Sequence, residues 1–147
     1  MPQLTITRRN LPHWFTEGAT YYVTFRVKAG SLNEDEIRLI LDHIRSGDQR
    51  FYQLMAACIM PDHVHVILAP NADLSLSDVM RGIKGVTARK INSLRRTLGA
   101  LWQDESWDRI LRGEEELMEK LNYMLMNPVK AGIAEDPWSY HGWFLNI

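Results

Sequence analysis

The sequence predicts an α+β fold, with an antiparallel β-sheet and helices packed on one of its faces. Two observations lead to this prediction. Short segments rich in β-branched and aromatic residues alternate with longer segments whose apolar residues recur at helical spacing. The expected order is strand, helix, strand, strand, helix, strand, which is the ferredoxin-like, split βαβ arrangement. A further helix is expected near the end of the chain.

The first half of the chain predicts three strands and one helix. Residues 21–27 (YYVTFRV) are β-branched and aromatic and precede Ala29-Gly30, so they predict a strand. Ser31 or Asn33 can cap a helix that has three acidic residues in its first turn and ends at Gly47. Residues 51–58 predict the second strand, although part of this segment could be helical. Residues 63–69 predict the third strand.

The second half predicts a long helix, a short strand and a final helix. The long helix begins at Ser75 or Ser77 and carries its apolar stripe as far as Leu98. Residues 107–112 predict the fourth strand. The final helix is expected over residues 114–127, because Pro128 disfavours helical geometry at the residue before it. The aromatic tail, about residues 134–147, is expected to be irregular. Its aromatic residues could stack on unpaired bases, but packing onto the sheet is favoured: Trp138, Tyr140, Trp143 and Phe144.

Composition indicates a soluble protein of 147 residues that fits a single domain. Apolar residues make up 46% and charged residues 24%. No run approaches the roughly 18 apolar residues of a membrane span, and the N-terminus does not resemble a signal peptide. Cys58 is the only cysteine, which excludes an internal disulfide and a zinc ribbon and suits a reducing compartment. We therefore expect a cytoplasmic protein with no membrane partner.

Charge is distributed unevenly along the chain. Residues 79–103 contain no acidic residue, whereas residues 104–119 contain seven. Such asymmetry suggests a polyanionic partner, although a solvated helix surface explains it equally well. The basic residues of the first segment are Arg81, Lys84, Arg89, Lys90, Arg95 and Arg96.

Two histidines stand two positions apart in an apolar strand. Because side chains alternate across a strand, His63 and His65 share one face, while Val64 and Val66 share the other. Their Cα atoms are then roughly 6.5–7 Å apart, and two imidazoles at that spacing can converge on one divalent ion. A third ligand would have to come from another element. The alternative is a pair of hydrogen-bonded structural histidines.

The final helix carries two residues that could complete such a site. Tyr123 and Asn127 are four positions apart and share one helix face. This spacing could place a phenol beside a metal-ligating oxygen. A half-buried tyrosine followed by a C-capping asparagine is the other interpretation. The expected packing stripe of the helix is formed by Leu117, Met118, Leu121, Met124 and Leu125.

Several spaced motifs together resemble the single-tyrosine HUH transposases, and most of all the REP-associated tyrosine transposases. In chain order they are NLPHW (10–14), GATY (18–21), MPDHVH (60–65), LWQ (101–103), DRI (108–110) and YMLMNPVKAG (123–132). The similarity covers nearly the whole chain. Two positions depart from the family pattern. Asp62 replaces a common asparagine, and Trp107 stands where tyrosine or phenylalanine is frequent.

The resemblance implies a function for each candidate residue. His63 and His65 would bind Mg²⁺ or Mn²⁺ with Asn127 as third ligand, and Tyr123 would be the nucleophile. The protein would be a metal-dependent endonuclease and strand transferase that acts on single-stranded hairpin DNA through a covalent 5′-phosphotyrosine. The basic stretch 81–96 would contribute to DNA binding. A non-catalytic DNA or RNA binder and a small metallohydrolase are the alternatives. Monomer and homodimer, with Tyr123 serving its own chain or the partner, both remain open.

Overall fold

The computed structural model describes residues 18–146, so the motif at residues 10–14 lies outside the described part of the chain. The predicted order of strands and helices is confirmed, and the chain adds two short elements after the final helix. The elements are β1 (Thr20–Arg26), α1 (Glu34–Ser46), β2 (Tyr52–Ile59), β3 (His63–Pro70), α2 (Leu76–Arg95), β4 (Trp107–Leu111), α3 (Glu114–Lys130), the 3-10 helix η3 (Pro137–Ser139) and β5 (Trp143–Leu145).

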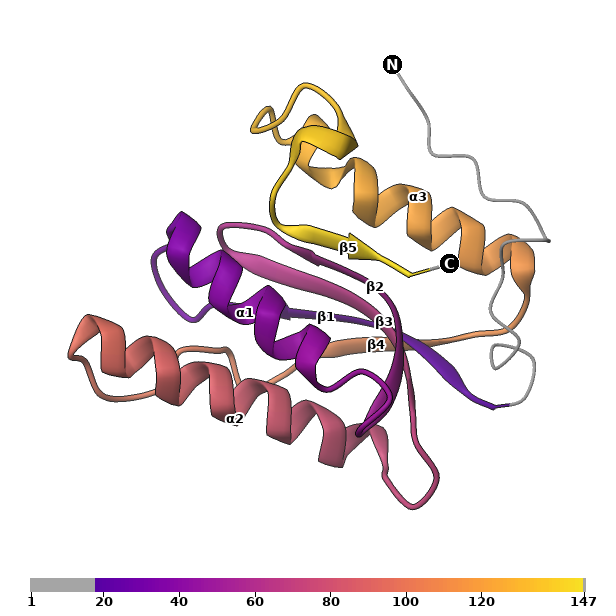
Figure 1. The fold of residues 1–147 in the computed structure, drawn as a ribbon, viewed down its shortest axis with the longest axis horizontal. Coiled ribbons are helices and arrows are strands. Elements are labelled where there is room, and N and C mark those ends of the chain that lie inside the picture. Colours follow the sequence, from indigo (N-terminus) through magenta and orange to yellow (C-terminus); the bar gives the residue numbers. More distant parts are fainter. Residues whose placement is uncertain (1–17, 147) are drawn as a thin grey trace.

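The strands form one five-stranded antiparallel sheet in the order β4-β1-β3-β2-β5. Helices α1 and α2 lie on one side of this sheet and α3 lies on the other (Figure 1). The prediction of helices on one face therefore holds for α1 and α2, while α3 covers the face that they leave open. The sheet is consequently the middle layer of three.

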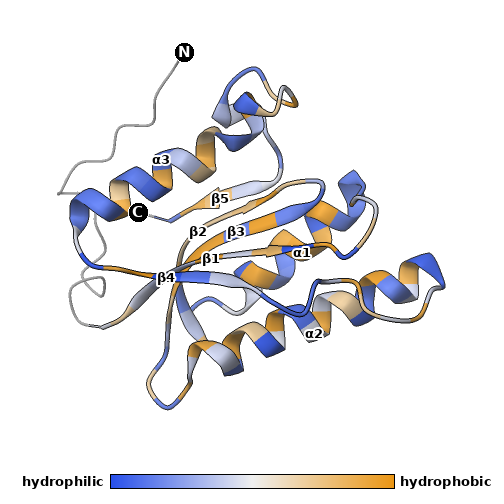
Figure 2. Ribbon diagram, turned by 180° about the vertical axis from the view of Figure 1, so that it is seen from behind, coloured by the Kyte–Doolittle hydropathy of each residue, from blue (hydrophilic) through white to orange (hydrophobic). Residues whose placement is uncertain are grey.

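A hydrophobic core lies on each side of the sheet. Val64 and Val66 of β3 pack with α1 and α2, whereas Ile67 packs with Leu117 and Leu121 of α3. Figure 2 shows hydrophobic residues concentrated in the central strands, and hydrophobic and hydrophilic residues interleaved along α2 and α3. This pattern is expected of central strands covered on both faces and of helices that turn one face to a sheet. Within residues 18–146, no helix is long and apolar enough to span a membrane.

Side-chain caps fix where the first two helices begin. Asn33, not Ser31, caps α1, and its side chain accepts a hydrogen bond from the backbone N–H of Glu36. Ser75, not Ser77, caps α2 in the same way. In both helices the third residue closes a capping box by accepting from the cap's own N–H. These caps satisfy backbone donors that would otherwise have no partner.

Pro128 does not end α3, and the prediction that it would is wrong. The helix continues through Pro128 to Lys130. The proline ring is buried, and proline costs the helix one backbone hydrogen bond because it has no N–H to donate to the carbonyl four residues earlier. The helix then closes in a Schellman motif, in which Gly132 has φ 75° and Ile133 N–H donates to the Pro128 carbonyl.

The tail is not irregular, contrary to the sequence prediction. Its last segment forms β5, which pairs with β2 and becomes the edge of the sheet. Tyr140 is buried and donates a hydrogen bond to the carbonyl of Ile59 at 2.5 Å. The favoured interpretation, packing onto the sheet, therefore holds for Tyr140, Trp143 and Phe144. Trp138 differs from them, because 62% of its surface is exposed.

A buried ion pair joins α1 to the end of α2. Arg95 Nε and Nη2 donate to the two carboxylate oxygens of Glu36 at 2.5 and 2.8 Å, and the Glu36 side chain is only 5% exposed. Glu36→Gln keeps the size of the side chain and an oxygen for the cap but removes the charge. We expect it to lower the free energy of unfolding by about 2–3 kcal/mol, because Arg95 loses its partner. Urea unfolding at pH 7 measures this loss.

The effect of Glu36→Gln should depend on pH. The Arg95 guanidinium holds the pKa of Glu36 below its ordinary value. The stabilisation of the fold by this ion pair is therefore complete above the unfolded-state pKa of Glu36, about 4.3. It is lost as the pH falls through the lower pKa of Glu36 in the folded state. Glu34→Gln, in the exposed first turn of α1, is the matched control and should change stability by less than about 0.5 kcal/mol. An equal loss in both variants would contradict the role of the ion pair.

Candidate active site

His63 and His65 point to the same face of the sheet, as strand alternation predicts. Their rings lie edge to face with centroids 4.7 Å apart. Val64, between them, belongs to the core on the opposite side. His65 is buried, with 4% of its surface exposed, and the side chain of His63 is 13% exposed. The two imidazoles therefore form one cluster beneath α3.

The Nδ1 atom of each histidine already has a partner. His65 Nδ1 lies 2.9 Å from both the Tyr22 and the Thr24 hydroxyl oxygens. Burial raises the pKa of Tyr22 to about 12, so this hydroxyl stays neutral. His63 Nδ1 lies 2.6 Å from a carboxylate oxygen of Asp62. When its Nδ1–H donates to such a partner, a neutral imidazole keeps its lone pair on Nε2, as metal-binding histidines do.

The Nε2 atom of His65 has no such partner in the described part of the chain. It is buried and makes no hydrogen bond among the described residues. Burial, reinforced by His63 and Arg26, lowers the pKa of His65 to about 3, so the ring is neutral at physiological pH. A buried acceptor without a partner is costly, and a cation bound there would satisfy it. The histidine pair thus fits a divalent metal ion.

Asp62 supports His63 from behind. The hydrogen bond from His63 lowers the pKa of Asp62, so the carboxylate stays ionised. Carboxylate–histidine pairs of this kind orient metal ligands and strengthen them as donors. Asp62 stands where asparagine is common in the resembled family, so His63 has a charged acceptor here in place of an amide oxygen.

Tyr123 lies next to the histidines. Helix α3 packs on the sheet through Leu117, Leu121, Met124 and Leu125, which are all fully buried. This orientation leaves Tyr123 48% exposed, with its ring centroid 6.0 Å from that of His65 and nearly perpendicular to it. Because α3 packs on its own sheet, the tyrosine reaches the histidines of the same chain.

Asn127 stands one helical turn after Tyr123 and is half-buried. The helix is capped by Ala131, so the interpretation of Asn127 as a C-cap is wrong. Its side-chain amide makes no hydrogen bond with any residue of the range 18–146, including the two histidines. Within that range, no three histidine, cysteine or acidic side chains form a metal-binding group. The role of Asn127 as third ligand stays a prediction.

A cavity of about 290 Å³ opens beside Tyr123. Its lining residues are Tyr22, Thr24, Arg26, His65, Trp107, Lys120 and Tyr123. The contributions of β1 and of Lys120 were not predicted from the sequence. Strand alternation could have identified the residues of β1, because it places Tyr22, Thr24 and Arg26 on one face of the sheet. Which strand lies beside β3 is set by pairing, and here Thr24 pairs with His65 and Arg26 with His63.

Helix α2, which carries most of the predicted DNA-binding residues, lies on the other side of the sheet from α3 and Tyr123 (Figure 1). Arg95 is bound to Glu36. Lys84 donates to the backbone carbonyls of Gln103 and Asp104. Arg81 is exposed, and Lys90 lines a shallow depression beside α1. Their assignment to DNA binding, with Arg89 and Arg96, stays a prediction, and it would require a DNA contact on the far side of the sheet.

The chain is similar in sequence and in fold to several transposases. The chain is 24% identical to a REP-associated tyrosine transposase of Escherichia coli K12, over 81% of this chain and 72% of that protein. It is also 24% identical to a Haemophilus influenzae protein provisionally named as one, over 90% of this chain and 84% of the relative. A solved structure of a REP-associated tyrosine transposase bound to a REP hairpin superposes with a TM-score of 0.70. It covers 95% of this chain and 82% of its own, at 20% identity, so it supports the fold.

A second solved structure, of a Deinococcus radiodurans protein provisionally described as a transposase, has a TM-score of 0.51 at 20% identity. The match covers 84% of this chain and 97% of that one. The model of the family described as "Transposase IS200 like" matches residues 25–110, which is more than half of the chain and includes both histidines. The chain therefore belongs to the IS200-like transposase family and has a transposase-like role.

Proposed function

We propose that this protein is a metal-dependent single-stranded DNA endonuclease and strand transferase that cuts and rejoins DNA through Tyr123. One observation carries the proposal. The half-exposed Tyr123 ring lies beside His65, whose buried Nε2 has no hydrogen-bond partner among the described residues. A nucleophile and a metal-ligating group are thus adjacent on one face of the sheet. The names of the relatives support the same function.

His63, His65 and Asn127 would hold the metal ion, Mg²⁺ or Mn²⁺. When bound, such an ion supplies positive charge that offsets the charge developing on the phosphate oxygens. The protein's own contribution is orientation. Asp62 holds the ring of His63, and Tyr22 and Thr24 hold the ring of His65. These partners prevent the imidazoles from turning and keep their Nε2 atoms available.

Tyr123 would carry out the covalent step. Its phenol oxygen forms a bond to phosphorus, and the bond from phosphorus to the 3′ oxygen of the preceding nucleotide breaks. The phenol loses a proton, the leaving oxygen gains one, and the products are a 5′-phosphotyrosine and a free 3′-hydroxyl. Because one phosphodiester replaces another, a 3′-hydroxyl can later displace the tyrosine and rejoin the strand.

The proposed substrate is single-stranded DNA that forms a hairpin, such as a REP element. One structural neighbour is bound to a REP hairpin. The cavity beside Tyr123 has two cationic side chains, Arg26 and Lys120, among its lining residues. Cationic side chains beside Tyr123 can bind the negatively charged phosphates of the DNA backbone.

Incubation with end-labelled hairpin DNA and Mg²⁺ or Mn²⁺ tests this function. A denaturing gel should show a protein–DNA adduct and a shorter strand that ends in a 3′-hydroxyl. A non-catalytic binder would shift the DNA on a native gel without cutting it. A metallohydrolase would release a 5′-phosphate and leave no adduct. Either result would contradict the proposal.

The hydroxyls behind His65 should matter for metal affinity. We expect Tyr22→Phe combined with Thr24→Val to weaken Mn²⁺ binding by about 10- to 100-fold, because His65 loses the partners of its Nδ1. Each single variant should lose less, since one hydroxyl remains. Calorimetric titration with Mn²⁺ measures the affinity. Tyr21→Phe, on the opposite face of β1, is the matched control. An unchanged affinity in the double variant would exclude this role.

A further inference from the structure

Trp107 is an exposed aromatic side chain at the proposed reaction site. It lines the cavity that Tyr123 also lines, and 52% of its surface is exposed. Strand pairing explains its place, because Trp107 pairs with Thr24 on β1, and Thr24 pairs with His65 on β3. The Tyr22 ring meets the Trp107 ring edge to face, with centroids 5.6 Å apart. This contact holds one side of the indole, while the exposed half of its surface remains available to a ligand.

Two cations in the same cavity form no ion pair with the described residues. Within residues 18–146, neither Arg26 nor Lys120 lies within ion-pair distance of a carboxylate. Arg109, two positions after Trp107 on β4, differs from them, because Glu116 binds its guanidinium through two hydrogen bonds of 3.0 Å. The Lys120 ammonium lies 5.7 Å above the Tyr22 ring instead. The cavity thus combines aromatic surface with two cationic side chains that no carboxylate of the described residues contacts directly.

We propose that this cavity is a subsite for one unpaired nucleotide next to the scissile phosphate. Its base stacks on Trp107, and Arg26 and Lys120 bind its phosphates. Aromatic faces beside cationic side chains are how proteins bind single strands without reading their sequence. A cavity of about 290 Å³ is similar in size to a single nucleotide. The position of the scissile phosphate rests on the proposed function of Tyr123.

A cycle of protein and DNA changes tests the stacking. The DNA is a hairpin oligonucleotide with an unpaired flank, in which one base at a time is replaced by an abasic site. Binding is measured by fluorescence anisotropy in EDTA, so that no cleavage is needed. We expect Trp107→Ala to weaken binding of the intact DNA by about 5- to 100-fold. At one abasic position, the same substitution should cause no further loss.

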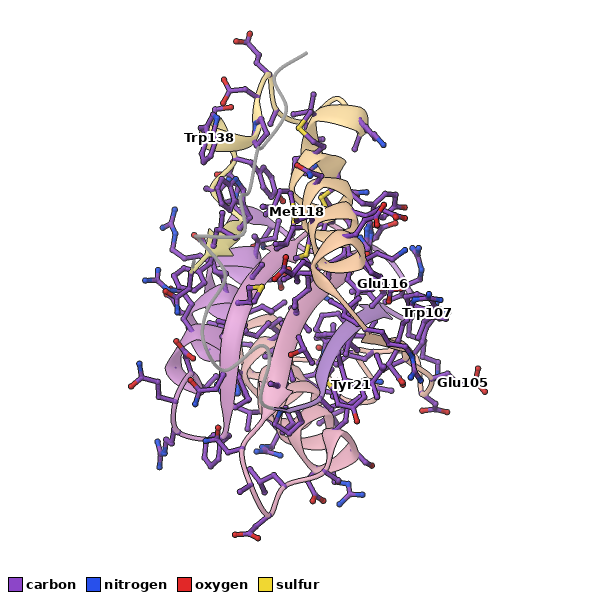
Figure 3. All side chains as sticks on the ribbon, turned by 90° about the vertical axis from the view of Figure 1, so that its right-hand side faces the viewer. Tyr21, Glu105, Trp107, Glu116, Met118 and Trp138 are labelled. Atoms are coloured by element: carbon purple, nitrogen blue, oxygen red, sulfur yellow. The ribbon has the colours of Figure 1, made fainter. Side chains whose placement is uncertain are left out.

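Further variants separate stacking from general damage to the fold. Trp107→Phe should keep most of the affinity and the same pattern along the DNA. Trp138→Ala removes another exposed tryptophan, on the opposite side of the molecule in Figure 3. It should show no coupling, which means that any effect on affinity should be the same for the intact DNA and for DNA with the abasic site. Lys120→Ala and Arg26→Ala should each lower the slope of log affinity against log salt by about 1.

An equal loss from Trp107→Ala at every abasic position would overturn the subsite and assign the tryptophan a structural role. The test is independent of catalysis. Position-specific coupling without any covalent adduct would support the subsite and contradict the proposed strand transfer. An adduct without coupling would do the reverse.

Discussion

Tyr123→Phe is expected to abolish the covalent protein–DNA adduct and to reduce cleavage by at least roughly 1,000-fold, because the attacking oxygen is removed. DNA binding should change little. Phenylalanine keeps the ring that lies against His65, and the lost hydroxyl belongs to a side chain that is 48% exposed. Adduct formation on a denaturing gel and binding on a native gel measure the two properties separately.

The matched control for this prediction is Tyr21→Phe. It removes the same hydroxyl from a tyrosine that packs with the α1 and α2 side of the sheet, so cleavage should be unaffected. An adduct that persisted in Tyr123→Phe would show that another residue is the nucleophile. Mixing Tyr123→Phe with a variant that lacks both histidines tests the placement of the tyrosine. If α3 serves its own chain, as in the structure, the mixture stays inactive.

Local rules predicted most of the fold because the relevant interactions lie close together in the sequence. The capping boxes at Asn33 and Ser75 join residues three positions apart, and strand alternation depends only on neighbouring residues. The same rules placed His63 and His65 on one face. Tyr123 and Asn127 were grouped from helical spacing alone.

The errors arose where distant residues decide the structure. Trp143–Leu145 is too short for its aromatic residues to predict a strand, and its strand geometry comes from pairing with the edge of β2. The rule that a helix ends before proline fails at Pro128, where the buried ring and the following Schellman motif outweigh the loss of one hydrogen bond.

The cavity beside Tyr123 was missed for a related reason. Strand order, not local pattern, brings Tyr22 and Arg26 next to the histidines and places Trp107 across from Thr24. The charge pattern directed attention to α2 instead. That helix is basic, but it packs on the opposite face of the sheet, and Glu36 already binds its Arg95. A count of charges along the chain cannot show which of them remain free in the fold.

Removal of the metal-binding histidines is expected to have the second large effect. His63→Ala with His65→Ala should abolish Mn²⁺ binding in calorimetry and reduce cleavage by at least roughly 1,000-fold, while binding of hairpin DNA persists. This double variant removes both Nε2 atoms that would bind the metal. That of His65 is buried and has no hydrogen-bond partner among the described residues. His141→Ala, an exposed histidine outside the cavity, is the control and should retain both properties.

Chelation tests the same role without disturbing the buried His65. EDTA should stop cleavage by the unaltered protein, and excess Mn²⁺ should restore it. A site in which the Nδ1 atoms are held by Asp62, Tyr22 and Thr24 should recover at once, because its donors are oriented before the ion arrives. Undiminished cleavage in EDTA would contradict the metal role.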